Sequence, residues 1–214
     1  MTGARSFPLV VAAPSGAGKT SLTRALLESR DDLAFSVSAT TRERRPHERD
    51  GVDYHFVDGP GFDAMIEAGE LVEWAMVHGE RYGTTRAAIQ AGVDAGRVVV
   101  LDIDIQGAAA IRDRFAEAVL VFVLPPSGEE LSRRLAGRGS EAEAERRRRL
   151  INARAELPSA PRFDYVVVND DFDAGVAALS AIVDAEMLRV DRQAGLEDAL
   201  RAIDRDIAEI LEES

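Results

Sequence analysis

The sequence predicts an α/β domain built on a parallel sheet, with two further segments inserted between its elements. Four short runs rich in β-branched residues are apolar throughout, helical patterns lie between them, and a glycine-rich turn joins the first run to a helix. Continuous apolar runs are typical of strands buried on both faces. Because strands that alternate with helices pair in parallel, we expect one sheet covered by helices. The runs are residues 7–13, 98–104, 118–124 and 164–169.

Size and composition favour one principal domain without covalent cross-links. The chain has 214 residues, 46% of them hydrophobic, which is enough for one substantial core. It has no cysteine, and His47, His55 and His78 lack the spacing of metal ligands, so disulfides and thiolate metal sites are excluded. The apolar stretch 7–13 is too short for a signal peptide, and no run approaches the ~18 residues of a membrane span. We expect a cytoplasmic protein without membrane contact.

The charge is acidic and concentrated near the carboxyl terminus. The formal net charge of −12 argues against a general nucleic-acid-binding protein. Residues 171–214 hold 12 Asp and Glu and four Arg, a net charge of −8, so the rest of the chain is only mildly acidic. Of the 26 basic residues, 25 are Arg, and the single Lys is Lys19. A general preference for Arg is the simplest explanation, but it makes the one lysine conspicuous.

Two segments break the alternation of strands and helices. Residues 35–82 are rich in Thr, Arg, Tyr and Gly, and they predict an inserted lobe of short strands with one helix near 62–68. Residues 127–157 carry eight Arg and six Glu in a mostly helical pattern. This lid segment is either a movable flap or an exposed pair of salt-bridged helices. The domain would span residues 6–187, with its core at 6–34, 83–126 and 158–187.

The residues that follow, 188–214, predict an acidic amphipathic helix. Its apolar residues recur at steps of four and three: Leu196, Leu200, Ile203, Ile207 and Ile210. Such a stripe most often packs on its parent domain, which we expect here, and self-association is the alternative. The expected state is a monomer or a weak homo-oligomer.

The glycine-rich turn after the first strand is typical of a phosphate-binding loop. It comprises Ala13, Pro14, Ser15, Gly16, Ala17, Gly18, Lys19 and Thr20. Gly16 and Gly18 let the backbone approach nucleotide phosphates, whose charge the helix N-terminus favours. Lys19 can reach the β and γ oxygens, and Thr20 offers a hydroxyl to Mg²⁺. Ala13 stands where the usual pattern has its first glycine, which is tolerable if this residue ends the strand with negative φ. An ordinary glycine turn is the alternative.

Acidic residues follow the second apolar run, at the edge where ligands bind in parallel sheets. Asp102 and Asp104 would lie there, close to the Mg²⁺ site. For Asp104, which directly precedes a helical pattern, a helix-capping role is the alternative.

Seven segments resemble those of the guanylate kinase family, in the family's order over about residues 7–189. They are 13–20, FSVSATTR at 35–42, GVDYHF at 51–56, LVEW at 71–74, RYGT at 81–84, LDIDIQG at 101–107 and VNDD at 168–171. The resemblance implies the fold of P-loop nucleoside monophosphate kinases, with a GMP-binding lobe at 35–82 and a helical lid at 127–157. It also implies an enzyme that transfers the γ-phosphoryl group of ATP to GMP, and to dGMP, with Mg²⁺ and no prosthetic group.

Roles for single residues come from the same resemblance. Guanine carries two parallel donors on its Watson–Crick edge that the carboxylate of Glu73 can accept together, whereas adenine lacks that pair. Planar guanidinium groups suit a phosphate dianion. The other implied ligands are Ser38 and Thr84 for the base, Arg42, Arg45, Tyr54 and Tyr82 for the GMP phosphate, Asp102 for GMP and, through water, Mg²⁺, Asn169 for ATP, and Arg134, Arg138 and Arg149 for the transferring phosphoryl group. Each alone would more often be structural, but their joint order favours function.

Two other functions would share this loop and sheet. A kinase of phosphorylated sugars should lack the guanine-reading set of Ser38, Glu73 and Thr84. A guanylate-kinase-like module that only binds peptides should have a degraded phosphate loop, whereas Lys19 is present here. His47 stands where relatives often have glycine, which leaves the geometry of its turn open.

Overall fold

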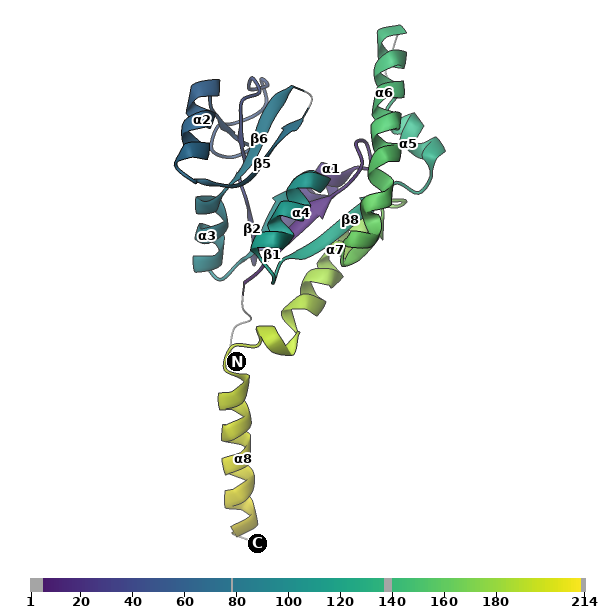
Figure 1. Cartoon of the computed structure of the whole chain (residues 1–214). Helices are drawn as coiled ribbons and strands as arrows, with labels where there is room; N and C mark the ends of the chain where they lie inside the picture. The colour runs from purple at the N-terminus through teal and green to yellow at the C-terminus, as the bar shows by residue number, and fades with distance from the viewer. Residues whose placement is uncertain (1–5, 78, 137–139, 213–214) are drawn as a thin grey trace.

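The protein folds around a five-stranded parallel sheet (Figure 1). A computed structural model describes residues 6–77, 79–136 and 140–212. The strands lie in the order β2, β7, β1, β8, β9, and every neighbouring pair is parallel. Their bounds are Leu33–Phe35 (β2), Val98–Asp102 (β7), Pro8–Ala12 (β1), Val119–Leu124 (β8) and Tyr165–Val168 (β9). Because β1 is central, the loop that follows it emerges at the middle of the sheet edge where parallel sheets bind ligands.

Helices cover both faces of this sheet. Leu9 and Val11 of β1 belong to one apolar cluster, and Val10 and Ala12 belong to the other, as expected for side chains that alternate between faces. Helices α1 and α7 close the first cluster, and α3 and α4 close the second. Their bounds are Lys19–Ser29 (α1), Phe172–Met187 (α7), Arg86–Asp94 (α3) and Ile105–Arg114 (α4). Burial on both sides explains why β1 is apolar at every position.

The parallel α/β class predicted from the sequence is confirmed, and its four expected strands are β1, β7, β8 and β9. The sequence does not predict β2 or α3. β2 has only three residues and follows the charged pair Asp31 and Asp32, so it never forms an apolar run. β7 ends at Asp102, two residues earlier than expected, because the side chain of Asp104 caps α4.

The inserted lobe contains a second sheet, in the order β4, β3, β6, β5. Its elements are Ala39–Thr40 (β3), His55–Phe56 (β4), Gly59–Glu67 (α2), Leu71–Val77 (β5) and Glu80–Thr85 (β6). Phe62 and Leu71 pack into its small core with Ala39. β6 carries the sheet to Thr85, three residues beyond the boundary expected from the sequence. Thr85 then caps α3, so the lobe passes directly into the main domain.

The lid segment forms two helices, α5 (Gly128–Arg134) and α6 (Ser140–Glu156), followed by the 3-10 turn η1 (Leu157–Arg162). Leu131 and Leu135 pack with Ala153, and this small apolar cluster joins the two helices. The glycines expected to interrupt the helical pattern, at 137 and 139, lie outside the described residues.

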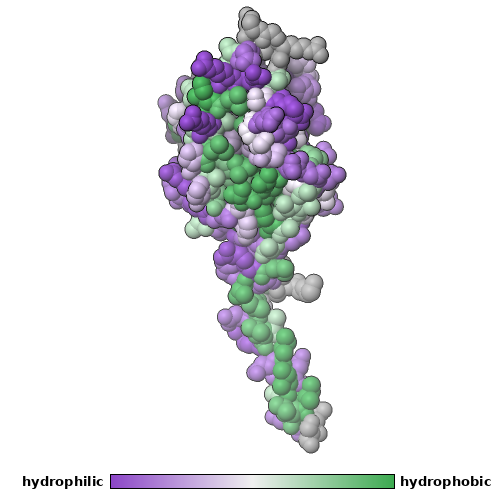
Figure 2. Space-filling model, turned by 90° about the vertical axis from the view of Figure 1, so that its right-hand side faces the viewer, coloured by the Kyte–Doolittle hydropathy of each residue, from purple (hydrophilic) through white to green (hydrophobic). Residues whose placement is uncertain are grey.

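The end of the chain differs from the expectation that its stripe packs on the parent domain. After α7 come the 3-10 turn η2 (Val190–Arg192) and α8 (Leu196–Glu212). No described residue of α8 is buried, and the helix points away from the body (Figures 1 and 2). Arg192 fixes the exit point, because its guanidinium lies 3.8 Å from the ring centroid of Phe7 and 3.0 Å from the Glu186 carboxylate. Within the described residues, no helix is long and apolar enough to cross a membrane.

We expect the face closed by α1 and α7 to carry much of the stability. Leu179→Ala removes a fully buried side chain of α7 and should lower the free energy of unfolding by about 2–5 kcal/mol. Leu188→Ala is the matched control, since Leu188 is 75% exposed and its loss should change stability by less than about 0.5 kcal/mol. Urea unfolding of both variants measures the difference. Equal midpoints would contradict the assignment of this core.

Candidate active site

The phosphate loop occupies the turn between β1 and α1. Gly16 and Gly18 have φ angles of +88° and +91°, in the left-handed region that glycine favours. Neither position has room for a side chain, because a Cβ on Gly18 would lie 2.3 Å from the Asn169 amide nitrogen and one on Gly16 would lie 2.6 Å from Leu135. Ala13, the departure from the usual pattern, packs against the first core cluster, where its methyl group is accommodated. The expected loop therefore has the conformation and setting of an anion-binding turn.

Lys19 lies at the first position of α1 and reaches across to the end of β7. Its ammonium group is 2.6 Å from a carboxylate oxygen of Asp102 and donates a 2.6 Å hydrogen bond to the Ile103 carbonyl. Asp104 accepts a hydrogen bond from the Gly107 N–H, so the capping role is the one observed. The only lysine is thus held at the carboxyl edge of the sheet by groups that a phosphate could replace.

A pocket of about 180 Å³ lies between this edge and the inserted lobe. It is lined by seven of the residues that the sequence predicts for the site: Lys19, Thr20, Ser38, Tyr54, Glu73, Tyr82 and Asp102. In the described part of the chain, no cluster of three His, Cys, Asp or Glu could hold a metal by protein ligands alone. The Thr20 hydroxyl and the Asp102 carboxylate are oxygen donors that line this pocket together, a set that fits Mg²⁺, which keeps several waters and binds substrate phosphates.

Glu73 forms the buried end of the pocket. It lies on β5 opposite Thr84 of β6, whose hydroxyl donates a hydrogen bond to one carboxylate oxygen. The other oxygen faces Gly107 in the first turn of α4, where a Cβ would approach it to 2.9 Å. Glu73 is only 8% exposed, and this burial raises its pKa, partly offset by the hydrogen bond from Thr84. A buried carboxylate with so few partners among the described residues is ready to accept hydrogen bonds from a ligand.

A second group of side chains extends from the pocket along the lobe. Arg42 donates to the Tyr82 hydroxyl at 3.2 Å and to Glu48 at 2.7 Å, and its guanidinium lies 5.5 Å from the ring centroid of Tyr54. Tyr54 and Tyr82 contact each other edge to face. Arg42, Tyr54 and Tyr82 are therefore brought together as predicted. The sequence analysis missed Glu48, which is buried and whose pKa the hydrogen bond from Arg42 holds below its usual value.

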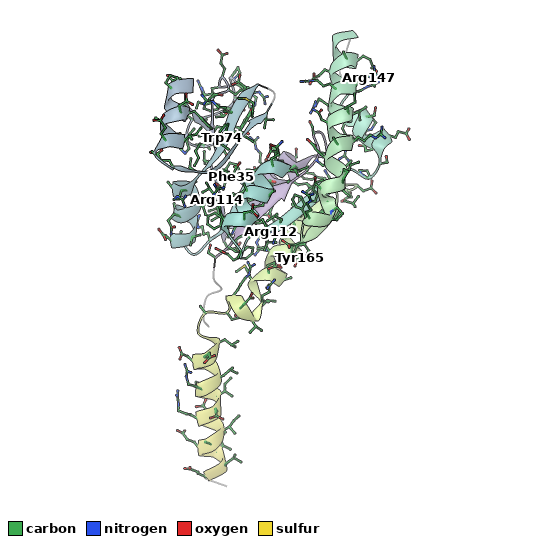
Figure 3. All side chains as sticks on the ribbon, viewed as in Figure 1. Phe35, Trp74, Arg112, Arg114, Arg147 and Tyr165 are labelled. Carbon is green, nitrogen blue, oxygen red and sulfur yellow. The ribbon has the colours of Figure 1, made fainter. Side chains whose placement is uncertain are left out.

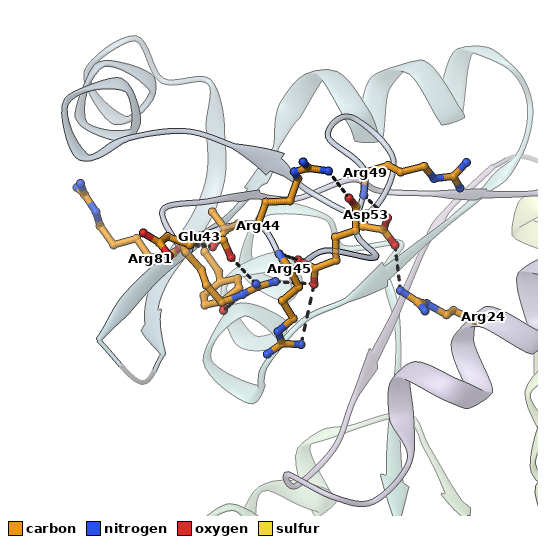
Figure 4. Close-up of polar contacts among 11 residues, drawn as sticks. Arg24, Glu43, Arg44, Arg45, Arg49, Asp53 and Arg81 are labelled. Atoms are coloured by element: carbon orange, nitrogen blue, oxygen red, sulfur yellow. Dashed lines mark hydrogen bonds and ion pairs between the residues drawn. The ribbon is translucent and has the colours of Figure 1, made fainter.

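Arg45 lies at the rim and does not line the pocket. Its side chain is 62% exposed and its guanidinium is 4.0 Å from Glu48. The turn that carries it closes with a hydrogen bond from the Glu48 N–H to the Arg45 carbonyl, and His47 is exposed within that turn. Figure 4 shows this arginine-rich region, in which Asp53 of the lobe pairs with Arg24 of α1 at 3.0 Å. That pair joins the lobe to the main domain.

The lid segment contacts the phosphate loop through two of its predicted arginines. Arg134 donates to the carbonyls of Ala17 and Asn169, at 3.3 and 3.0 Å. Arg149 donates twice to the Ser15 hydroxyl, at 3.0 and 2.7 Å. The third, Arg138, lies outside the described residues.

The other arginines of α6 are directed differently. Arg146 and Arg148 pair with glutamates three residues before them, at 2.7 and 2.8 Å. Arg147 is exposed on the upper part of the helix (Figure 3). The salt-bridged surface offered by the sequence analysis is therefore observed along α6, and Arg149 adds a contact with the loop. The movable flap stays a prediction.

Glu156, the last residue of α6, also belongs to this group, although sequence reasoning did not select it. One of its carboxylate oxygens is buried without a hydrogen-bond partner among the described residues. Burial raises the pKa of Glu156, and the backbone N–H of Ser15, which faces the carboxylate, offsets part of that rise. Glu156 is one of six glutamates in the lid segment, and no sequence signal distinguishes it from the other five.

Comparison with known proteins decides which family has this arrangement. The family model described as guanylate kinase matches residues 5–186, most of the chain. The chain belongs to the guanylate kinase family. A guanylate kinase of Chromohalobacter salexigens is 49% identical over 86% of this chain and 85% of its own length. A guanylate kinase of Thermotoga maritima is 44% identical over 86% of this chain and 88% of its own.

A solved structure extends the likeness to three dimensions. The crystal structure of guanylate kinase from Anaplasma phagocytophilum has a TM-score of 0.79 with this chain and 36% sequence identity. The match covers 94% of this chain and 96% of that one, so it includes the core, the lobe and the lid segment. The fold and the family expected from the sequence are both confirmed.

Burial of the Glu73 charge should reduce stability at neutral pH. Because its pKa is raised above 4.5, the folded state binds this proton more tightly than the unfolded chain does. Stability then falls as pH rises from 4.5 through the raised pKa, and the full cost is present once pH exceeds that pKa. Glu73→Gln should therefore raise the Tm at about pH 7.5, with a gain that disappears toward about pH 4. Calorimetry across this range measures it.

The matched control is Glu70→Gln, which changes an exposed carboxylate three residues earlier. Its Tm should follow that of the wild type at every pH. A Glu73→Gln variant that is less stable than the wild type at neutral pH would show that the buried carboxylate does not destabilise the fold.

Proposed function

We propose that the pocket and the phosphate loop hold GMP and ATP, respectively, on the two sides of Lys19. As a member of the guanylate kinase family, the chain is an enzyme that transfers the γ-phosphoryl group of ATP to GMP, giving ADP and GDP. A phosphate oxygen of GMP attacks the γ-phosphorus while the bond to the bridging oxygen of ADP breaks. Such an activity serves purine nucleotide metabolism by returning GMP to the diphosphate pool.

The observation that carries the GMP assignment is the buried carboxylate of Glu73. Its Oε1 is engaged by Thr84, but both oxygens retain lone pairs toward the pocket, and Ser38 lines the same pocket. A carboxylate here accepts the two parallel donors of guanine, so the base is read by its edge. The 2′ position of the ribose plays no part in this reading, so dGMP is a substrate as well.

The GMP phosphate lies beyond the base, against the cluster of Arg42, Tyr54 and Tyr82. One arginine supplies a planar pair of donors, and the two phenols add donors without further charge. Glu48 orients Arg42 from behind and is a positioning residue. Arg45 joins from the rim, where its exposed side chain is free to swing toward the phosphate.

ATP occupies the phosphate loop, with residues 13–20 around its β and γ groups and Asn169 beside them. Lys19 then exchanges the Asp102 carboxylate for phosphate oxygens, which leaves Asp102 free to face GMP. Thr20 would hold Mg²⁺, and Asp102 would contact it through water. The ion supplies charge neutralisation to the phosphates when it is bound with ATP.

The lid arginines act on the phosphoryl group during its transfer from ATP to GMP. Arg134 and Arg149 already lie over the loop, and Arg138 is assigned to the same role from its place in the family pattern. Little covalent chemistry is required of the protein, so the positioning of substrates and the neutralisation of charge supply the catalysis. We assign the enzyme to the cytoplasm, with no nucleic-acid or membrane partner.

The substrate assignment predicts a specificity change in Glu73→Gln. The amide replaces one acceptor oxygen with an NH₂ group that faces a guanine N–H. One hydrogen bond is therefore lost, and two hydrogen-bond donors face each other without an acceptor between them. Charged hydrogen bonds contribute about 1.5–3 kcal/mol, so kcat/KM for GMP should fall by about ten- to a few-hundred-fold. AMP should lose much less, because its ring nitrogen is an acceptor.

Coupled ADP-release assays with GMP, dGMP, AMP, UMP and ribose phosphates measure this directly. The KM for ATP is the internal control and should be nearly unchanged, since Glu73 lies on β5 of the lobe and the phosphate loop is in another part of the chain. An unchanged ratio of GMP to AMP activity would remove Glu73 from base recognition. Activity toward ribose phosphates alone, or no activity, would favour the sugar kinase or the binding module.

The lid assignment predicts different effects for two arginines of one helix. Arg149→Ala should lower kcat by about 10²–10³-fold with little change in the KM for GMP, because its donors act on charge that develops in the transition state. Arg147→Ala, two residues away and exposed, should leave both parameters unchanged. Steady-state kinetics on folded proteins tests the pair. Equal effects at both positions would mean that Arg149 acts only through the net charge of the lid segment.

A further inference from the structure

The apolar face of α8 is left uncovered by the described residues of the single chain. Leu200, Ile203 and Ile207 are 57%, 55% and 51% exposed, and Leu211 is 72% exposed. Figure 2 shows the stripe as a continuous strip along the side of the helix that extends from the body. In proteins, most of the stability of a helix comes from packing of its apolar face and not from propensity. α8 is thus an amphipathic helix whose apolar face needs a cover that the described residues do not provide.

The spacing of the stripe identifies the kind of surface that would cover it. Leu196, Leu200, Ile203 and Ile207 alternate steps of four and three, so they occupy the d, a, d and a positions of a heptad repeat. A mean period of 3.5 residues keeps such a seam against another helix of the same kind. The combination of Leu200 at a with the β-branched Ile203 at d favours bundles of three or four helices over two.

The flanking charges select the orientation of the partner helix. Asp204 and Asp206 occupy the e and g positions beside the seam. In an antiparallel pair of α8 helices, e positions face e positions and g positions face g positions, so Asp204 and Asp206 would each lie on an edge shared with the acidic residues of the other copy, and like charges so placed are destabilising. In a parallel arrangement, Asp206 faces Leu211 of the next copy and Asp204 faces Ala199. Of the two orientations, the parallel one avoids pairing acids with acids.

We propose that copies of this chain associate through α8 as a parallel bundle of helices. The acidic outer surface argues against a membrane as the cover: Leu196–Glu212 carries six Asp and Glu and two Arg, whereas interfacial helices carry Lys and Arg on their polar face. The bodies would lie at one end of the bundle. Because α8 extends from the opposite end of the molecule from the lid helices α5 and α6 in Figure 1, each active site stays open.

Light scattering on the full-length chain tests the association. The expected mass at micromolar concentration is three to four times 23.2 kDa. Ile203→Asp, which places a charge in the seam, should return the protein to the monomer mass with unchanged kcat. Ala208→Asp adds the same charge on the outer face and should leave the assembly intact. A monomeric wild type, or an assembly that survives Ile203→Asp, would overturn the proposal.

The orientation can be tested by cross-linking because the chain has no cysteine of its own. In a parallel bundle, the thiol of a Leu200→Cys variant meets its own copy and should form an interchain disulfide on mild oxidation. In an antiparallel bundle, the thiols introduced at this position would lie apart along the axis. Ala208→Cys, on the outer face, is the control and should not cross-link. Failure of Leu200→Cys to cross-link, with the assembly intact, would rule out the parallel register.

Discussion

The hydrogen bond from the Asn169 side chain to the Ala17 carbonyl, 2.8 Å long, ties the end of β9 to the phosphate loop after β1. It leaves no room for a side chain at Gly18, so it depends on glycine there. Arg134 of the lid segment donates to the same carbonyl and to that of Asn169. One peptide group therefore connects the sheet, the loop and the lid. Ser15 provides a second connection, since Arg149 contacts its hydroxyl and Glu156 faces its N–H.

The GMP side of the site follows a different physical principle. There the fold buries the Glu73 carboxylate, and under the proposed function the binding energy for the base comes from hydrogen bonds to that group. Recognition and stability would then oppose each other at this residue. In the proposed phosphate-binding cluster, Glu48 pairs with Arg42 and would neutralise it while the substrate is away.

Sequence reasoning succeeded where a local backbone conformation requires a particular type of residue. The loop glycines, the buried strands and the cap at Asp104 follow from backbone rules, so they could be predicted. Glu48 and Glu156 could not, because their function comes from burial against segments distant in the chain. The same holds for α8, whose stripe predicts a packed face. The chain leaves the domain at Arg192, which contacts Phe7, a residue near the other end of the sequence. The lobe and the lid segment are predicted from their break in the alternation of strands and helices, whereas the roles assigned to them come from the family resemblance.

The pairing of Lys19 with Asp102 has a chemical consequence. Every other cationic side chain is a guanidinium or an imidazole, so the chain has one ε-amine, and it lies within the catalytic centre. Acylation of that amine removes its charge and its ability to follow a phosphate. Amine-directed modification of the side chains in this sequence therefore has one target, Lys19. Under the roles proposed above, nucleotide and Asp102 would both shield that amine, so its rate of labelling would report on occupancy of the phosphate loop.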